Sequence, residues 1–184
     1  LVFNITLPAE LHGHWQTYSF VRKSITKVLN SGTAWAGIAF YAGYKLARPW
    51  ASFFGGIGAA LLALVLHYLI GSLTQVYPSG EIWNNIIWFQ AALVLCGPIG
   101  LTGHLATTGG PWGLLGRLVV PAGAVLEPFV LGHFSRLWPE LPWAERWSNV
   151  VSGVVLLVFG IASASWVIWR SRQTNPVAVA ARPR

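Results

Sequence analysis

The chain has 184 residues, of which 54% are hydrophobic and 9% are charged, and its formal net charge is +7. A soluble domain carries about a quarter charged residues, so this composition excludes a water-soluble globular protein. Between Arg48 and Arg117 the single formal charge is Glu81. Because a spanning helix needs about 20 mostly apolar residues, we expect an all-helical, polytopic membrane bundle. It should contain about five to six transmembrane helices, some of them short or interrupted by proline.

The first part of the chain is mixed in character. Residues 1–7 resemble the end of an apolar helix that Pro8 closes, and because the sequence contains no Met we expect an upstream segment to be missing. Residues 9–31 interleave aromatic side chains with Arg22, Lys23 and Lys27, which predicts an interfacial segment lying along the membrane surface. Residues 33–47 then form a short apolar run that ends before Pro49.

Four longer apolar runs follow, and each can cross a bilayer. They comprise residues 51–71, 84–105, 112–132 and 148–169. Pro98 is expected to break the second run, and Pro121 and Pro128 to interrupt the third. Residues 1–172 are therefore predicted to form a single transmembrane domain, and the basic tail at 173–184 is expected to be disordered.

Small residues recur within these runs. Gly55 and Gly56 lie in the first, and Gly97, Gly100 and Gly103 are spaced three apart in the second. Small side chains let helix backbones approach closely. They predict close packing within the chain, with homodimerisation as the alternative.

The distribution of Lys and Arg predicts the orientation of the bundle. The C-terminal tail is basic and the 45–50 loop carries Lys45 and Arg48, whereas the 72–83 loop has neither Lys nor Arg. We therefore expect the tail and the 45–50 loop on the cytoplasmic side of a bacterial plasma membrane. Segments 8–32, 72–83 and 133–147 then lie outside, and the cations of the first of these stand against the positive-inside rule.

The 133–147 segment is too aromatic for a freely solvated loop. Its aromatic side chains include Phe134, Trp138, Trp143 and Trp147. Such a segment is expected to fold back onto the outer membrane face or onto a partner protein. These four residues are therefore the candidate partner interface.

Glu127 is the acidic residue inside a predicted span. A carboxylate at that depth costs on the order of a few kcal/mol, so it should face the bundle interior, either as a hydrogen-bonded packing group or as a proton, ion or ligand-amine site. His67 is predicted at a similar depth, and with His133 it completes a candidate outward-facing ligand or ion pocket. The two imidazoles are also candidate ligands for haem or a divalent metal, although no histidine pair has the i, i+4 spacing of a metal-binding helix.

No catalytic signature occurs in the sequence. The GxSxG, HExxH, CxxC and Walker patterns are absent, and the single cysteine, Cys96, excludes a disulfide framework. We therefore expect a protein that is not an enzyme. The basic tail beside the last apolar run is typical of a cytoplasmic membrane flank, so no nucleic-acid partner is expected.

Two short motifs suggest a relationship. The sequence NSGTAW at 30–35 and the sequence GPIGLTG at 97–103, with short spans between them, resemble a family of small bacterial multi-pass membrane proteins of unknown function. The resemblance covers roughly residues 28–135 and implies a helical membrane fold without an activity. The chain is also similar in size and topology to the substrate-binding membrane subunits of vitamin importers, from which no ligand motif carries over.

Three functions remain open. The first is an accessory or structural subunit of a larger complex, with the lipid bilayer and other membrane proteins as partners. The second is a solute-binding or transport subunit with an outward-facing pocket near Glu127 and His67. The third is a haem- or metal-binding membrane protein. The lack of catalytic groups and the aromatic outer segment favour the first.

Overall fold

The structure is a computed structural model, and it describes residues 15–75, 77, 80–135 and 141–173, apart from the side chain of Glu81. Regular secondary structure in these ranges is helical throughout. Within these ranges four helices are long and apolar enough to cross a membrane, namely α4 (Pro49–Leu73), α6 (Ile86–Leu105), α7 (Gly110–Val130) and α8 (Trp143–Gln173). The predicted helical membrane bundle is confirmed.

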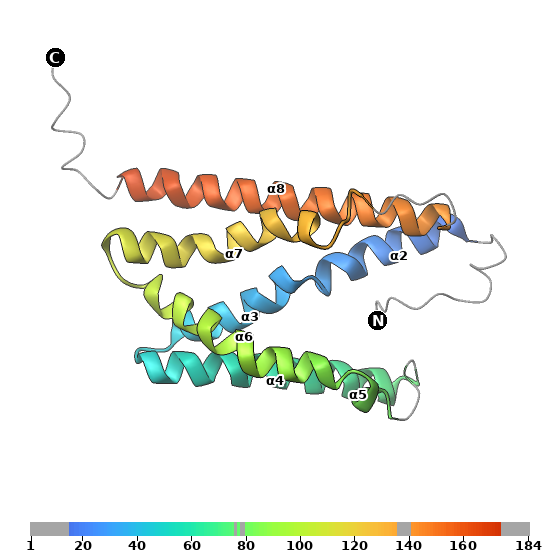
Figure 1. Cartoon of the computed structure of the whole chain (residues 1–184), viewed down its shortest axis with the longest axis horizontal. Helices are drawn as coiled ribbons and strands as arrows, with labels where there is room; N and C mark the ends of the chain where they lie inside the picture. The colour runs from blue at the N-terminus through green and yellow to red at the C-terminus, as the bar shows by residue number, and fades with distance from the viewer. Residues whose placement is uncertain (1–14, 76, 78–79, 136–140, 174–184) are drawn as a thin grey trace, which may run out of the picture.

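The other helices are shorter. α2 (Gln16–Leu29) and α3 (Gly32–Lys45) have 14 residues each, and α5 (Glu81–Asn84) is a single turn before α6. A 14-residue helix is about 21 Å long, too short to cross the hydrocarbon alone. α2 and α3 run one after the other across the bundle, from the side of α8 to the side of α4 (Figure 1). The apolar run at 33–47 is thus α3, and α2 extends it beyond a break.

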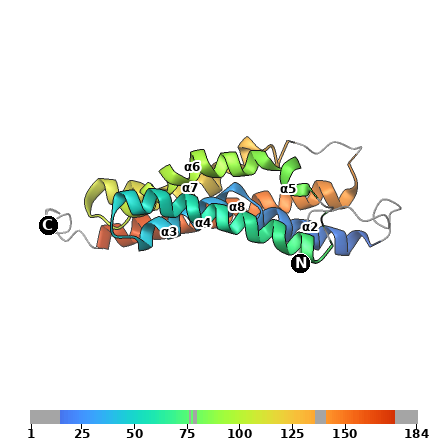
Figure 2. The same cartoon turned by 90° about the horizontal axis from the view of Figure 1, so that it is seen from below.

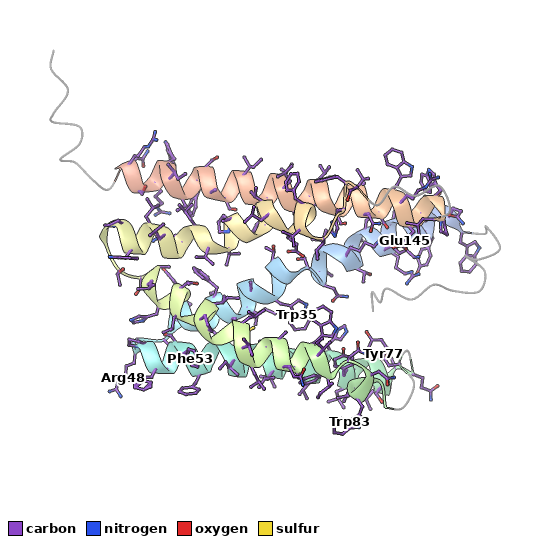
Figure 3. The ribbon with its side chains drawn as sticks, viewed as in Figure 1. Trp35, Arg48, Phe53, Tyr77, Trp83 and Glu145 are labelled. Carbon is purple, nitrogen blue, oxygen red and sulfur yellow. The ribbon has the colours of Figure 1, made fainter. Side chains whose placement is uncertain are left out.

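α3 lies between two pairs of long helices. α7 and α8 pack side by side on one side of it, and α4 and α6 pack side by side on the other (Figure 1). The long helices run along one common axis (Figure 2). The bundle therefore has two ends, which we call the Arg48 end and the Glu145 end after the residues labelled there in Figure 3.

The structure differs from the prediction at the prolines. Pro98 lies inside α6, and Pro121 and Pro128 lie inside α7, yet both helices continue through them. A proline removes one backbone hydrogen bond. In a membrane bundle, neighbouring helices and local backbone adjustments can satisfy the carbonyl group that this leaves free. The break falls instead before α3, where the hydroxyl of Ser31 caps the helix by accepting from the N–H of Ala34 (3.1 Å).

Helices α3, α4 and α6 pack through glycines. Gly43 of α3 and Gly56 of α4 both contact Gly100 of α6, and a Cβ added at Gly100 would overlap the carbonyl oxygen of Ser52. Backbones this close are held by van der Waals contact without intervening side chains. The prediction that small residues pack within the chain is confirmed for Gly56 and Gly100, and Gly43 adds a contact that was not predicted.

Candidate functional site

Glu127 lies in the last turn of α7 and contacts the first turn of α3. Its carboxylate accepts from the backbone N–H groups of Gly32 and Thr33, both at 2.7 Å, and from the hydroxyl of Thr33 at 2.6 Å. The first four N–H groups of a helix have no partner within that helix, and the helix dipole places partial positive charge there. Glu127 therefore supplies an anionic cap for α3 from a different helix.

Arg117, near the other end of α7, does the converse for α6. Its Nε donates to the carbonyl oxygen of Ala106 (2.8 Å), and its Nη2 donates to that of Thr108 (3.2 Å). These carbonyls lie just past the C-terminus of α6, where a cation is favoured by the helix dipole. α7 thus places an acidic side chain at the N-terminus of α3 and a basic side chain at the C-terminus of α6, which are the signs that the two helix dipoles favour.

A second carboxylate, Glu145, joins α8 to α2 at the Glu145 end (Figure 3). Lys23 Nζ lies 2.6 Å from its Oε2, and Lys27 Nζ lies 2.5 Å from its Oε1. Lys27 also donates to Ser148 (2.8 Å) and Asn149 (2.6 Å). Burial lowers the pKa of Lys27, and the contact with Glu145 opposes that shift. One carboxylate therefore holds two ammonium groups between the helices.

This ion cluster was not predicted from the sequence. The sequence places Lys23 among the cations of the predicted interfacial segment, yet this side chain is 4% exposed. The i, i+4 spacing of Lys23 and Lys27 places both on one face of α2, and that spacing was the available signal. Their partner could not be read from the sequence, because Glu145 lies 122 and 118 residues away.

His67 of α4 belongs to an aromatic cluster. Its Nε2 lies 2.9 Å from the hydroxyl oxygen of Tyr77, and its ring stands edge-on to Trp35 and Tyr68, with centroid distances of 6.3 and 5.4 Å. Tyr77 folds back after α4, and its N–H donates to the carbonyl of Gly71 (3.1 Å). His67 therefore ties the chain that follows α4 to the bundle.

His133 follows α7 and faces α8. Its Nδ1 lies 3.5 Å from the hydroxyl oxygen of Ser152, and its neighbour Phe134 rests close to Gly153. A small pocket beside it is lined by Leu131, Gly132, His133 and Asn149. His133 is thus a predicted site residue that borders a small pocket.

The three predicted site residues have separate partners. The first turn of α3 meets Glu127 of α7, whereas Trp35 one turn further on faces His67 of α4. His133 lies on the α8 side. Within the part of the chain that the structure describes, no group of three or more His, Cys, Asp or Glu could hold a metal ion. The outward-facing pocket and the haem or metal site stay predictions.

The predicted partner interface divides into three parts. Trp143 and Trp147 at the start of α8 are 47% and 49% exposed. Phe134 is half-buried and packs against Phe129, with ring centroids 5.5 Å apart. Trp138 lies outside the described residues. The two tryptophans of α8 therefore remain as the described, half-exposed part of that interface, although Trp143 also packs against Phe20 of α2, with ring centroids 5.3 Å apart.

The fold and these contacts define the class as a polytopic helical membrane protein. No protein-family model, curated protein or solved structure matches this chain. The resemblance to small bacterial membrane proteins stays a prediction, and function must be inferred from the contacts described above.

Proposed function

We propose that this protein is a non-enzymatic, multi-pass subunit of a larger membrane complex. The observation that carries the proposal is the contrast between engaged polar groups and exposed aromatic ones. Glu127 has both carboxylate oxygens bonded to α3, and Glu145 has both bonded to lysines of α2. Trp143 and Trp147 are about half exposed, and Trp143 also packs one side of its ring against Phe20 of α2. The two carboxylates thus stabilise contacts between helices, whereas the exposed parts of the two indoles are available to a partner protein.

The exposed indoles stand on a projection of the bundle. α2 and the start of α8 extend beyond the end of α7 (Figure 1), and we call residues 16–27 and 143–150 the α2–α8 projection. Large exposed aromatic residues on or next to it are Trp15, Tyr18, Trp143 and Trp147. Trp and Tyr are enriched among the residues that dominate binding energy at protein interfaces. A partner that packs against this projection would bury them.

We further propose that the Arg48 end faces the cytoplasm of a bacterial plasma membrane, with the C-terminus inside. The cations of this end come from four helices or their flanks, and they are Lys45, Arg48, Arg117, Arg170 and Arg172. Such a gathering supports this orientation under the positive-inside rule. At the other end Glu145 pairs with both Lys23 and Lys27 and so offsets one of their two positive charges, which lessens the conflict with that rule. The α2–α8 projection then faces outward.

Native mass spectrometry of the protein extracted from its own membrane in mild detergent tests the proposal. We expect the mass of this chain plus a second polypeptide. Replacing Trp143 and Trp147 with Ala should reduce the fraction of complex, because truncating a central interface tryptophan costs on the order of 2 kcal/mol. Trp169→Ala is the matched control, since Trp169 is 57% exposed at the opposite end. A lone wild-type chain would contradict the proposal.

A second candidate function is solute binding or transport. The observation that favours it is the break between α2 and α3, because transporters build substrate and ion sites where helices are interrupted. Glu127 at the open end of α3 is the residue to test, and Glu127→Gln removes its charge at nearly constant size. Loss of uptake or ligand binding in a folded variant would support transport. Unchanged uptake and an unchanged complex mass would leave Glu127 a packing residue.

A further inference from the structure

Acidic and basic residues are divided unequally between the two ends of the bundle. The acidic positions in the part of the chain that the structure describes are Glu81, Glu127 and Glu145, and all three lie on the Glu145 side (Figure 1). The turn between α3 and α4, the turn between α6 and α7 and the last turn of α8 meet at the opposite end, where the cations named above gather. No carboxylate among the described residues offsets the charge of the Arg48 end, so this end complements an anionic surface.

Lys45 and Arg48 flank the short turn between α3 and α4, and both are exposed. Arg117 is already bonded to carbonyl groups past the end of α6. Lys45 Nζ instead lies over the exposed ring of Tyr41, 5.4 Å from its centroid, and Arg48 projects from the end of the bundle (Figure 3). Three residues of chain span at most about 11 Å, so the two flexible side chains can reach one common anion.

The exposed side chains next to these cations become apolar toward the centre of the bundle. Ile38, Tyr41 and Lys45 share one face of α3, because residues three and four apart are neighbours on a helix, and all three are exposed. On α4, Trp50 and Phe54 are exposed and one turn apart. Tyr and Trp rings prefer the headgroup level of a membrane. The order of side chains along these faces is therefore that of a phospholipid, namely charge, interface and hydrocarbon.

We infer that the α3–α4 turn binds the headgroup of an anionic phospholipid between Lys45 and Arg48, with the acyl chains along the exposed faces of α3 and α4. A guanidinium donates two parallel N–H bonds to phosphate oxygens, and an ammonium adds a compact positive charge. Basic sites on the cytoplasmic side of transmembrane helices bind such headgroups, and we place the Arg48 end on that side. The inference goes beyond the proposed complex, because lipid binding needs no partner protein.

Native mass spectrometry with added lipid tests the inference. The purified protein in mild detergent is titrated with dioleoylphosphatidylglycerol, which is anionic, and in parallel with dioleoylphosphatidylcholine, which has no net charge. We expect the wild type to bind the anionic lipid more tightly. Lys45→Gln and Arg48→Gln should each weaken that binding about fivefold, and the double variant about thirtyfold, since each basic residue near an anionic surface contributes a factor of about five.

The double variant Arg170→Gln, Arg172→Gln is the matched control. It removes two exposed positive charges from the same end, but α8 lies on the other side of α3 from α4 (Figure 1). Because salt screens charges that are far apart, this variant should bind the anionic lipid nearly as tightly as the wild type. All four substituted side chains are exposed, and an unaltered circular-dichroism spectrum and melting temperature would show that both double variants fold.

The outcomes separate this inference from the proposed function. Equal affinity of the wild type for the two lipids, or an equal loss in the two double variants, overturns the inference and leaves the proposed complex intact. Displacement of the lipid by inorganic phosphate also overturns it, since the turn would then bind a free anion. So does loss of a partner protein from the Lys45→Gln, Arg48→Gln variant with unchanged lipid affinity. A lone wild-type chain that selects the anionic lipid overturns the proposed function alone.

Discussion

The two sides of the bundle are joined by different chemistry. α3, α4 and α6 meet backbone to backbone at glycines such as Gly100, whereas α2 and α8 meet through the charged side chains of Lys23, Lys27 and Glu145. In lipid there is no hydrophobic force between apolar helices, so close van der Waals approach has to hold them. α2 is the least apolar of the helices and binds through ion pairs and hydroxyl groups. The composition of each helix therefore indicates which kind of contact it makes.

Gly100→Val should have the largest effect, because it disrupts the side that depends on close approach. A Cβ at Gly100 would overlap the carbonyl oxygen of Ser52 and press on the Cα of Gly56. Overpacking costs about 1–3 kcal/mol and occasionally more, and here the opposing atoms are backbone. We expect most of the protein to be lost from the monodisperse peak in detergent chromatography, with a lower melting temperature for the remainder.

Gly58→Val is the control for that substitution. Gly58 lies on the same α4 helix as Gly56, but an added Cβ would meet nothing within 4 Å. It should fold as well as the wild type. Equal melting temperatures for Gly58→Val and Gly100→Val would refute the backbone contact.

Glu145→Gln tests the ionic side and should rank second. It leaves Lys23 and Lys27 without their counter-charge, and breaking a buried pair costs about 3–5 kcal/mol. Because the Glu145 side chain is 24% exposed, we expect roughly 2–3 kcal/mol. Hydrogen exchange should accelerate in α2 while α4 and α6 stay protected. Adding Lys23→Met and Lys27→Met should restore much of the lost stability. If Glu145→Gln alone leaves the exchange protection of α2 unchanged, the ion cluster is contradicted.

Glu127→Gln tests the point where the two sides meet. An amide has one acceptor oxygen, whereas Glu127 accepts through both of its oxygens, at Gly32 and at Thr33. Weakening a helix cap costs about 1–2 kcal/mol. The hydrogen-exchange rate should increase most at the first amides of α3, and the increase should become smaller further along the helix. Thr33→Val, which removes one hydroxyl donor, should show a smaller change, and the opposite ranking would contradict the cap.

Tyr77→Phe should have the smallest effect. It removes the hydrogen bond between the Tyr77 hydroxyl and His67, and a neutral bond of this kind contributes about 0.5–1.5 kcal/mol. We expect faster exchange at the Tyr77 amide, which donates to Gly71, with little change in the melting temperature. Gly71→Ala should perturb this segment more, because its Cβ would overlap the Tyr77 ring.

Hydropathy predicted the long helices well. The runs at 51–71 and 84–105 correspond to α4 (Pro49–Leu73) and α6 (Ile86–Leu105), because a bilayer demands one uninterrupted apolar segment of that length. α8 (Trp143–Gln173) extends well before the predicted start at 148. Its first turns carry charged side chains that a hydropathy argument discards, although these form the contact with α2.

The helix break and the contacts could not be predicted in the same way. Proline is the sequence signal for an interrupted helix, yet Pro98 lies within a continuous helix and the break comes at Asn30 and Ser31. The depth of Glu127 in a predicted span marks it as a candidate site residue. Its role as a hydrogen-bond acceptor for α3 could not be predicted, because its partners are mainly backbone amides. Backbone groups have no residue signature, and Gly32 is 95 residues away.

The contact of Glu127 also has a consequence for how the protein is made. Synthesis runs from the N-terminus, so α3 is inserted before α7 exists, and 95 residues separate Gly32 from the carboxylate that caps it. Until then the first amides of α3 face lipid or water without that acceptor, and an unsatisfied group in hydrocarbon costs roughly several kcal/mol. The N-terminal half is therefore an unfinished insertion intermediate that the last turn of α7 completes. A chain truncated before that turn would keep the first amides of α3 without this acceptor.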